Sequence, residues 1–260
     1  MRSLMARIAI ISDIHANYHA LCEVIEDVRA MQCTELICLG DVVGYNAFPA
    51  ECLDYIRTLG CPVVKGNHDE EVVSPSVANM NPVARQAMDW TRNQLDSERL
   101  DWLSRLQYQR IIRSDSGKAL TIVHSSLDQP KAWNYVINAN DASSNFRRQF
   151  SPICFHGHTH IPKVFRWNGT HAAVDHDAIH PLYIDGYTEF SPDPACKYFI
   201  NVGSVGQPRD NDPRACYAIY DTDINLIIIK RVSYDIQAAQ SAICAAGLPE
   251  YLAERLERGC

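Results

Sequence analysis

The chain alternates short apolar runs with polar segments. Five runs of three or four apolar residues are each followed at once by polar residues or glycine: 8–11, 36–39, 61–64, 120–123 and 153–155. Unbroken apolar runs of this length are typical of strands buried on both faces, as in parallel sheets. The pattern therefore predicts five buried β-strands.

Helical spacing fills the gaps between the first three runs. Apolar residues recur at helical spacing over 21–31, and Asn17 is placed to cap that helix. Pro49 and Gly60 bound the next helix, because proline suits a first turn and glycine suits a helix end. The run 61–64 then gives way to a polar stretch, 66–69, which predicts a tight loop. These 69 residues predict strand-helix-strand-helix-strand, half of a parallel α/β arrangement.

The remainder predicts more helices and a hairpin. Residues 215–220 and 224–232, joined by a polar turn, predict a hairpin in a second sheet. Residues 168–196 are irregular, so a loop or a β-excursion is expected, and a lid over a functional site is the alternative. No repeat or linker divides the chain, and we interpret residues 1–260 as a single domain. Helices are expected from Asn81-Pro82 onward and over 97–106, 141–150, 235–246 and 250–258.

Charge excludes one class of partner. The 24 Lys and Arg residues against 31 Asp and Glu residues give a formal net charge of −7. Proteins held to nucleic acid by counterion release carry excess positive charge, so no nucleic-acid partner is expected. No apolar stretch approaches the roughly 20 residues that a membrane span requires, so no membrane partner is expected either. The sequence leaves the oligomeric state open.

The ten cysteines indicate a compartment rather than a disulfide framework. No C-x-x-C pair occurs. Six of the cysteines lie within apolar patterns: Cys22, Cys38, Cys52, Cys154, Cys216 and Cys244. Free thiols behave as small buried hydrophobes and persist in reducing surroundings. A cytoplasmic location is therefore expected.

Potential metal ligands stand at the ends of all five predicted strands. Ligands of open α/β sheets bind beyond the carboxyl ends of the strands. Carboxylate, imidazole and amide donors without thiolate suit Mn, Fe, Zn or a similar ion. Seven donors exceed what one ion takes, whereas two ions sharing a carboxylate would use them all. The candidates are Asp13, His15, Asp41, Asn67, His124, His158 and His160.

These motifs resemble those of a known superfamily. The order D-x-H (13–15), G-D (40–41), G-N-H-D (66–69), a lone His124 and G-H-T-H (157–160) is similar to the calcineurin-like metallophosphoesterases. Residues 40–45, 201–210 and 247–250 extend the resemblance over essentially the whole chain. They resemble a bacterial and archaeal group of predicted phosphodiesterases related to symmetrical diadenosine tetraphosphatase. The resemblance implies a four-layer α/β/β/α sandwich, in which two mixed sheets are flanked by helices.

The resemblance also implies two divalent transition-metal ions, with Mn²⁺ expected first and Fe, Zn, Ni or Co as alternatives. By implication one ion takes Asp13, His15, Asp41 and His160, and the other takes Asp41, Asn67, His124 and His158. Asp41 would bridge the two, and a metal-bridging hydroxide would attack phosphorus in line. His68 would stabilise or protonate the leaving oxygen, and Asp69 would hold the His68 ring in place.

Substrate choice and some residues remain open. Arg209 follows a Gly-rich turn and either binds substrate phosphate or pairs with Asp210 or Asp212. Residues 46–48 and 125–126 depart from the superfamily pattern and could line the substrate groove. The histidines at 171, 176 and 180 are interpreted as part of a solvated loop rather than a third metal site.

The expected activity is hydrolysis of a small phosphorylated substrate, possibly a nucleotide, with a phosphodiester or a dinucleoside polyphosphate preferred. A phosphomonoesterase or protein phosphatase is the alternative within the enzyme class. The alternative outside it is a non-catalytic scaffold that keeps the fold, as in the retromer subunit that this superfamily resembles.

Overall fold

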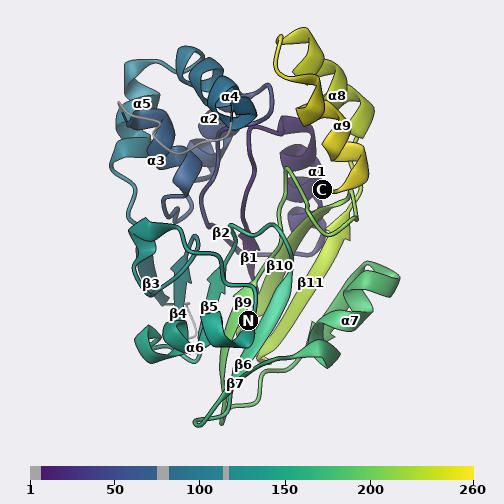
Figure 1. Cartoon of the computed structure of the whole chain (residues 1–260). Coiled ribbons are helices and arrows are strands. Elements are labelled where there is room, and N and C mark those ends of the chain that lie inside the picture. The colour runs from purple at the N-terminus through teal and green to yellow at the C-terminus, as the bar shows by residue number, and fades with distance from the viewer. Residues whose placement is uncertain (1–6, 75–81, 114–116) are drawn as a thin grey trace, which may run out of the picture.

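Two mixed β-sheets pack face to face in the computed structural model, which describes residues 7–74, 82–113 and 117–260 (Figure 1). The first sheet has the order β2 (Glu35–Cys38), β1 (Arg7–Ile11), β10 (Ala215–Asp221), β11 (Leu226–Val232) and β8 (Tyr187–Phe190). The second has the order β3 (Gln109–Arg113), β4 (Ala119–Val123), β5 (Ile153–His156), β9 (Lys197–Asn201), β6 (Lys163–Trp167) and β7 (Ala172–Val174). Parallel pairs occupy only part of each sheet: β1 with β2, β4 with β5, and β5 with β9.

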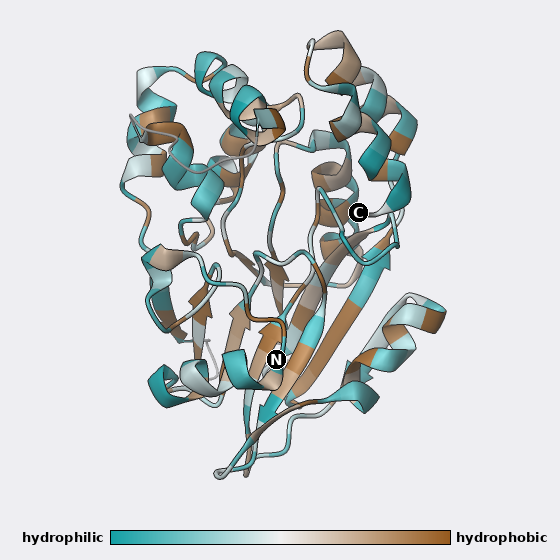
Figure 2. Ribbon diagram, in the orientation of Figure 1, coloured by the Kyte–Doolittle hydropathy of each residue, from teal (hydrophilic) through white to brown (hydrophobic). Residues whose placement is uncertain are grey.

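Side-chain alternation along the strands builds the layers. In β1, Ala9 and Ile11 join the core formed with helices α1 (Tyr18–Ala30) and α2 (Pro49–Leu59). Ile8 and Ile10 join the core between the two sheets. The opposite face of the second sheet packs on α6 (Ala139–Arg148). Figure 2 shows the hydrophobic colour concentrated on the strands. The four-layer α/β/β/α prediction is confirmed.

The signals that bound the first two helices act as expected. The Asn17 side chain accepts a hydrogen bond from the Ala20 backbone N–H at 3.1 Å and so caps α1. Pro49 opens α2, and Gly60 ends it in the left-handed conformation at φ 62°. These two helices cover the outer face of the first sheet, so the loops that precede them lie above the carboxyl ends of β1 and β2.

Of the other helices, those that stand near their predicted positions are α4 (Pro82–Asn93), α5 (Ser97–Ser104), α8 (Ile236–Ala245) and α9 (Glu250–Arg258). Those that were not expected are α3 (Asn67–Val73), the 3₁₀ turn η1 (Pro130–Ala132) and α7 (His176–Asp185). Asn81, expected to start α4, lies outside the described residues. The predicted loop 66–69 instead supplies a cap, Gly66, and the first turn of α3. The run 61–64 forms only isolated bridges, Cys38 with Val63 and Val64 with Gln107, rather than a full strand.

One prediction about the second half was wrong and another holds only in part. The 215–232 hairpin lies in the first sheet, because β10 pairs antiparallel with β1. Residues 168–196 hold the strands β7 and β8, as a β-excursion does, but also the helix α7, which was not expected. Pro181 inside α7 obscures the helical pattern, yet Ile179 and Leu182 are buried in the core between the sheets, and that packing outweighs the local cost of proline. Segment 168–196 therefore closes one edge of the core.

Two further expectations concern the cysteines and membrane spans. All ten cysteines fall within the described residues and are free thiols. Within the described ranges, no helix combines the length and the apolarity that a bilayer crossing demands.

Packing between the sheets can be tested at Phe155, which has no exposed surface, against the nearby Phe150, which is 88% exposed. Phe155→Ala should lower the free energy of unfolding by about 3–5 kcal/mol, because it opens a cavity between the sheets. Phe150→Ala should change it by less than about 0.5 kcal/mol. Urea denaturation measures both. Equal losses from the two variants would contradict the packing described.

Candidate metal centre

The loops after β1 and β2 continue the pairing of the two strands. Beyond the strand ends, the Asp13 N–H donates to the Gly40 carbonyl at 3.0 Å, and the His15 N–H donates to the Asp41 carbonyl at 2.9 Å. Because the strands are parallel, both loops leave the same edge of the sheet. This pairing brings Asp13, His15 and Asp41 together.

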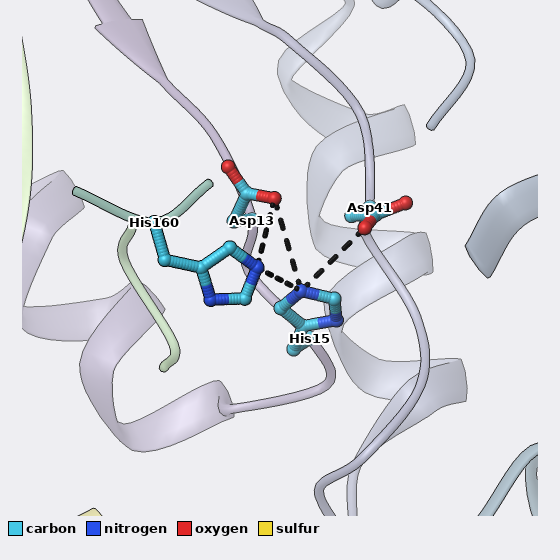
Figure 3. A group of neighbouring side chains, drawn as sticks. All are labelled: Asp13, His15, Asp41 and His160. Atoms are coloured by element: carbon cyan, nitrogen blue, oxygen red, sulfur yellow. Dashed lines mark hydrogen bonds and ion pairs between the residues drawn. The ribbon is translucent and has the colours of Figure 1, made fainter. Parts of the chain in front are cut away.

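A first group of potential metal ligands consists of Asp13, His15, Asp41 and His160 (Figure 3). The His160 Nε2 atom lies 3.2 Å from Asp13 Oδ1, and His15 Nε2 lies 3.5 Å from Asp41 Oδ2. The Nε2 atoms of His15 and His160 are 3.0 Å apart. All four side chains are buried. His15 and His160, 145 positions apart in the chain, thus point their donor atoms at one small volume.

A second group shares Asp41 with the first and adds His124 and His158. His124 Nε2 lies 3.4 Å from Asp41 Oδ2, the oxygen that also faces His15. Asn67, a predicted ligand, is the first residue of α3, and its buried Oδ1 has no hydrogen-bond partner. One carboxylate therefore lies between two sets of donors.

Backbone carbonyls fix the orientation of each imidazole. The Nδ1 atoms of His15, His124 and His160 lie 3.3, 2.8 and 2.5 Å from the carbonyl oxygens of Val43, Leu39 and Gln207. A carbonyl only accepts, so each Nδ1 carries a proton, and in its neutral form each ring presents the Nε2 lone pair to the centre. His158 is reversed: its Nε2 donates to the Trp133 carbonyl at 2.8 Å and leaves Nδ1 free.

This arrangement fits cations. Two Nε2 lone pairs 3.0 Å apart repel each other and have no proton to share. Asp13 Oδ1 and His124 Nε2 are also buried without a hydrogen-bond partner. Unsatisfied buried polar atoms cost about 1–3 kcal/mol each, so their concentration at one point requires a ligand that accepts lone pairs. The donor set of carboxylate, imidazole and amide suits divalent transition metals.

Electrostatics keep most of these groups in ligand form. Burial opposes the ionisation of Asp41, but the imidazoles of His124 and His68 outweigh it and hold the carboxyl pKa well below its usual range. Burial lowers the pKa of His15 well below its ordinary value and that of His158 to about 3. Burial also opposes protonation of His124, yet the Asp41 and Asp13 carboxylates raise its pKa to about 9. A cation between them would compete with that proton.

Backbone strain gathers at the same residues. Left-handed φ values between 48° and 67° occur at five candidate ligands, namely Asp13, His15, Asp41, His158 and His160. This conformation costs non-glycine residues roughly 1–2 kcal/mol each. Strain of this kind persists only where the surrounding structure enforces it, and it clusters at functional sites.

Two glycines allow the loops to approach closely. A Cβ atom at Gly66 would lie 2.0 Å from Asp41 Oδ1, and one at Gly157 would lie 2.3 Å from Asp13 Oδ2. Any side chain at either position would displace a carboxylate of the centre. The glycines of the G-N-H-D and G-H-T-H motifs are therefore required by contact with the ligands.

Asp69 has partners other than the one expected. Its carboxylate accepts hydrogen bonds from the backbone N–H groups of Asp41, Val42 and Gly66 at 2.9–3.0 Å. Contact with the His68 ring, which the sequence analysis expected, is not among its hydrogen bonds in the described part of the chain. Both carboxylate oxygens are occupied by backbone N–H groups, so Asp69 positions the Asp41 loop instead. Burial, followed by the Asp41 charge, raises the pKa of Asp69 to about 6.

His68 lies at the rim of the two groups. Its backbone N–H donates to Asp41 Oδ1 at 2.8 Å, and its ring centroid is 4.4 Å from that of Tyr45 and 4.7 Å from that of His15. Its buried Nδ1 has no hydrogen-bond partner. Burial lowers the pKa of His68 to about 4, so the ring is neutral at pH 7.

Arg209 has neither of its two expected acidic partners. Asp210 pairs with Arg231, and Asp212 pairs with Arg214 at 2.6 Å. The Arg209 Nη2 donates to Gln207 Oε1 at 2.9 Å, and its guanidinium carbon lies 5.9 Å from the centre of the Tyr45 ring. The structural alternative for Arg209 is therefore absent from the described residues.

The histidines at 171, 176 and 180 join no group of potential metal ligands among the described residues, and Asp175 caps α7.

Sequence reasoning missed two aromatic residues beside the centre. The Trp133 carbonyl orients His158, and the ring of Tyr135 stacks on His158 with centroids 4.4 Å apart. Both follow η1 in an irregular segment without periodicity. The only feature of the sequence that could have indicated a site here is two aromatic residues, Trp133 and Tyr135, two positions apart in an otherwise polar segment.

Comparison with known proteins places this arrangement in a family. Residues 6–225 match the calcineurin-like phosphoesterase superfamily domain. An uncharacterized protein of Methanocaldococcus jannaschii is 38% identical over 255 residues, which are 97% of this chain and 98% of that protein.

Solved structures agree. A metallophosphoesterase from Sphaerobacter thermophilus is 39% identical, with a TM-score of 0.85 over 98% of this chain and 100% of that one. A hypothetical protein from Pyrococcus horikoshii OT3, 16% identical, shares the fold with a TM-score of 0.80 over 98% of this chain and 99% of that one. The chain therefore belongs to the calcineurin-like phosphoesterase superfamily, a family of phosphoric ester hydrolases.

Proposed function

We propose that the chain is a dinuclear metal-dependent phosphoesterase that hydrolyses a small phosphodiester or a dinucleoside polyphosphate. The observation that carries this proposal is the position of Asp41, whose Oδ2 faces both His15 and His124. A carboxylate shared by two donor groups is the arrangement that two ions about 3.5–4 Å apart require. Such a pair supplies charge neutralisation at phosphorus and an acidified water at neutral pH.

The chain's own residues divide the work. Asp13, His15 and His160 would hold one ion, Asn67, His124 and His158 would hold the other, and Asp41 would serve both. We propose manganese as the ion, because hard oxygen and imidazole donors are present and thiolate is not. The ten free cysteines support a reducing, cytoplasmic setting for the same protein.

His68 is proposed to stabilise the leaving oxygen. Its ring is neutral at pH 7, so a ring N–H can donate a hydrogen bond to an oxygen that gains negative charge, while the proton stays on the ring. Tyr45 and His15 pack on the ring and limit its rotation. Asp69 acts indirectly, because it fixes the loop that carries Asp41.

Burial of the donors supports a small substrate. The Asp and His donors of both groups are at most 7% exposed, Asn67 is half-buried, and Tyr135 and Trp133 flank His158. A phosphate on a slender molecule reaches such donors more readily than one on a folded protein surface. The presence of every motif residue, His68 included, supports an enzyme over a scaffold.

The first test is metal-dependent hydrolysis. Metal-stripped protein should not hydrolyse bis-p-nitrophenyl phosphate, and added Mn²⁺ should restore turnover, which absorbance of p-nitrophenolate measures. Failure to hydrolyse it with any of Mn, Fe, Zn, Ni or Co would favour the scaffold.

The shared carboxylate gives the second test. Asp41→Asn should reduce bound metal from about two ions per chain to less than one, because both donor groups lose the same charged ligand. Elemental analysis after dialysis measures this content. His180→Asn, at an exposed position on α7, is the matched control and should keep both ions. Full metal content in Asp41→Asn would remove Asp41 from its bridging position.

The third test separates chemistry from metal binding. His68→Ala should lower kcat by about 10²–10³-fold, the usual contribution of one hydrogen-bond donor to a developing oxyanion, while the metal content stays at that of the native protein. Steady-state kinetics and elemental analysis on one preparation check both. An unchanged kcat would exclude His68 from stabilising the leaving oxygen.

A further inference from the structure

Two arginines from distant segments converge on one tyrosine beside the candidate metal centre. Arg209 lies in the loop after β9, and Arg255 lies in α9. Their guanidinium carbons are 5.9 and 6.0 Å from the centre of the Tyr45 ring. That ring in turn contacts His68. Both guanidinium groups therefore lie against the tyrosine that contacts His68.

The fold holds the two segments together. The Asn211 N–H donates to the Gly259 carbonyl at 2.8 Å, which ties the Arg209 loop to the end of α9. A Cβ atom at Gly259 would lie 2.7 Å from the Asp212 backbone, so the two segments are in close contact. Tyr45 also packs against the apolar cluster that α8 and α9 form with α4. Convergence of the arginines is thus built into the scaffold.

Acidic residues close to these arginines in sequence are already paired with other cations. Asp210 pairs with Arg231, Asp212 with Arg214, and Glu254 with Arg258. Across the described ranges, no Asp or Glu side chain lies within ion-pair distance of Arg209 or Arg255.

Their remaining hydrogen bonds leave donors free. Arg209 donates to Gln207 through Nη2, and its buried Nε has no partner. The Nε of Arg255 donates to the backbone oxygen of Cys260. Within the described part of the chain, the outer nitrogens of Arg255 and the Nη1 of Arg209 have no hydrogen-bond partner and are thus available to a ligand.

Two half-buried like charges are costly unless an anion joins them. Both groups lie within 6.0 Å of the Tyr45 ring centre, and burial, followed by the charge of Arg209, lowers the pKa of Arg255. Guanidinium groups bind phosphate oxygens through paired N–H donors. A phosphate bound by both groups would satisfy their free donors and offset their like charge.

We propose that Arg209 and Arg255 form a second anion subsite, which binds a non-reacting phosphate group of the substrate beside the metal centre. This inference rests on the proposed function and narrows it. A substrate with one phosphate leaves the subsite empty, whereas a molecule with at least two phosphate groups fills both places. Dinucleoside polyphosphates are therefore preferred over simple phosphodiesters.

The test compares substrates with and without extra phosphates. Diadenosine tetraphosphate and bis-p-nitrophenyl phosphate are hydrolysed by native protein and by Arg255→Gln, and the ratio of their kcat/KM values is taken. Loss of one charge-assisted contact should reduce this ratio about tenfold, mainly through KM for the tetraphosphate. Arg255→Lys should recover part of it. Arg258→Gln, on the same helix and paired with Glu254, is the matched control and should leave the ratio unchanged.

An unaltered ratio in Arg255→Gln would overturn the subsite, as would equal losses on both substrates, since a merely structural role affects both. If the native protein hydrolyses neither substrate, the proposed function is contradicted instead. In that case calorimetric titration with inorganic pyrophosphate still decides the subsite. Native protein should bind pyrophosphate about tenfold more tightly than Arg255→Gln, and equal binding would exclude the subsite.

Discussion

The carboxylate of Asp41 is the interaction on which the site depends. One of its oxygens faces His15 and His124, and the other accepts the backbone N–H of His68. Asp69 holds the Asp41 backbone from behind, and Gly66 leaves room for the carboxylate. Four segments therefore meet at one side chain, and the buried polar atoms around it remain unsatisfied unless cations occupy the centre. This explains why strained backbone persists in the same loops.

Local signals made much of this predictable. The apolar runs that become β1, β2, β4 and β5 end at the candidate ligands, and ligands in α/β sheets bind at strand ends. Asn17, Pro49 and Gly60 marked helix boundaries because caps act over a few residues. The order of the five motifs then supplied the family and the four-layer fold.

What escaped prediction depends on contacts between distant residues. The pairing of β10 with β1 is invisible in either strand alone. Asp69 turned out to bind a loop 27–28 residues earlier rather than its neighbour His68, because its oxygens meet backbone N–H groups that only the folded chain brings near. Helix α7 was hidden by Pro181, whose local cost is offset by buried side chains. Arg255 gave no signal, since an arginine in an amphipathic helix is ordinary until its partners are known.

The pairing of the first strand also determines when the protein can mature during synthesis. One side of β1 meets β2 soon after it leaves the ribosome, but its other side must wait for β10, close to the end of the chain. Until then an apolar strand of four buried residues keeps an unpaired edge, which is the kind of surface that recruits chaperones or aggregates. Truncated or stalled chains should therefore be insoluble even when every metal ligand has already been made.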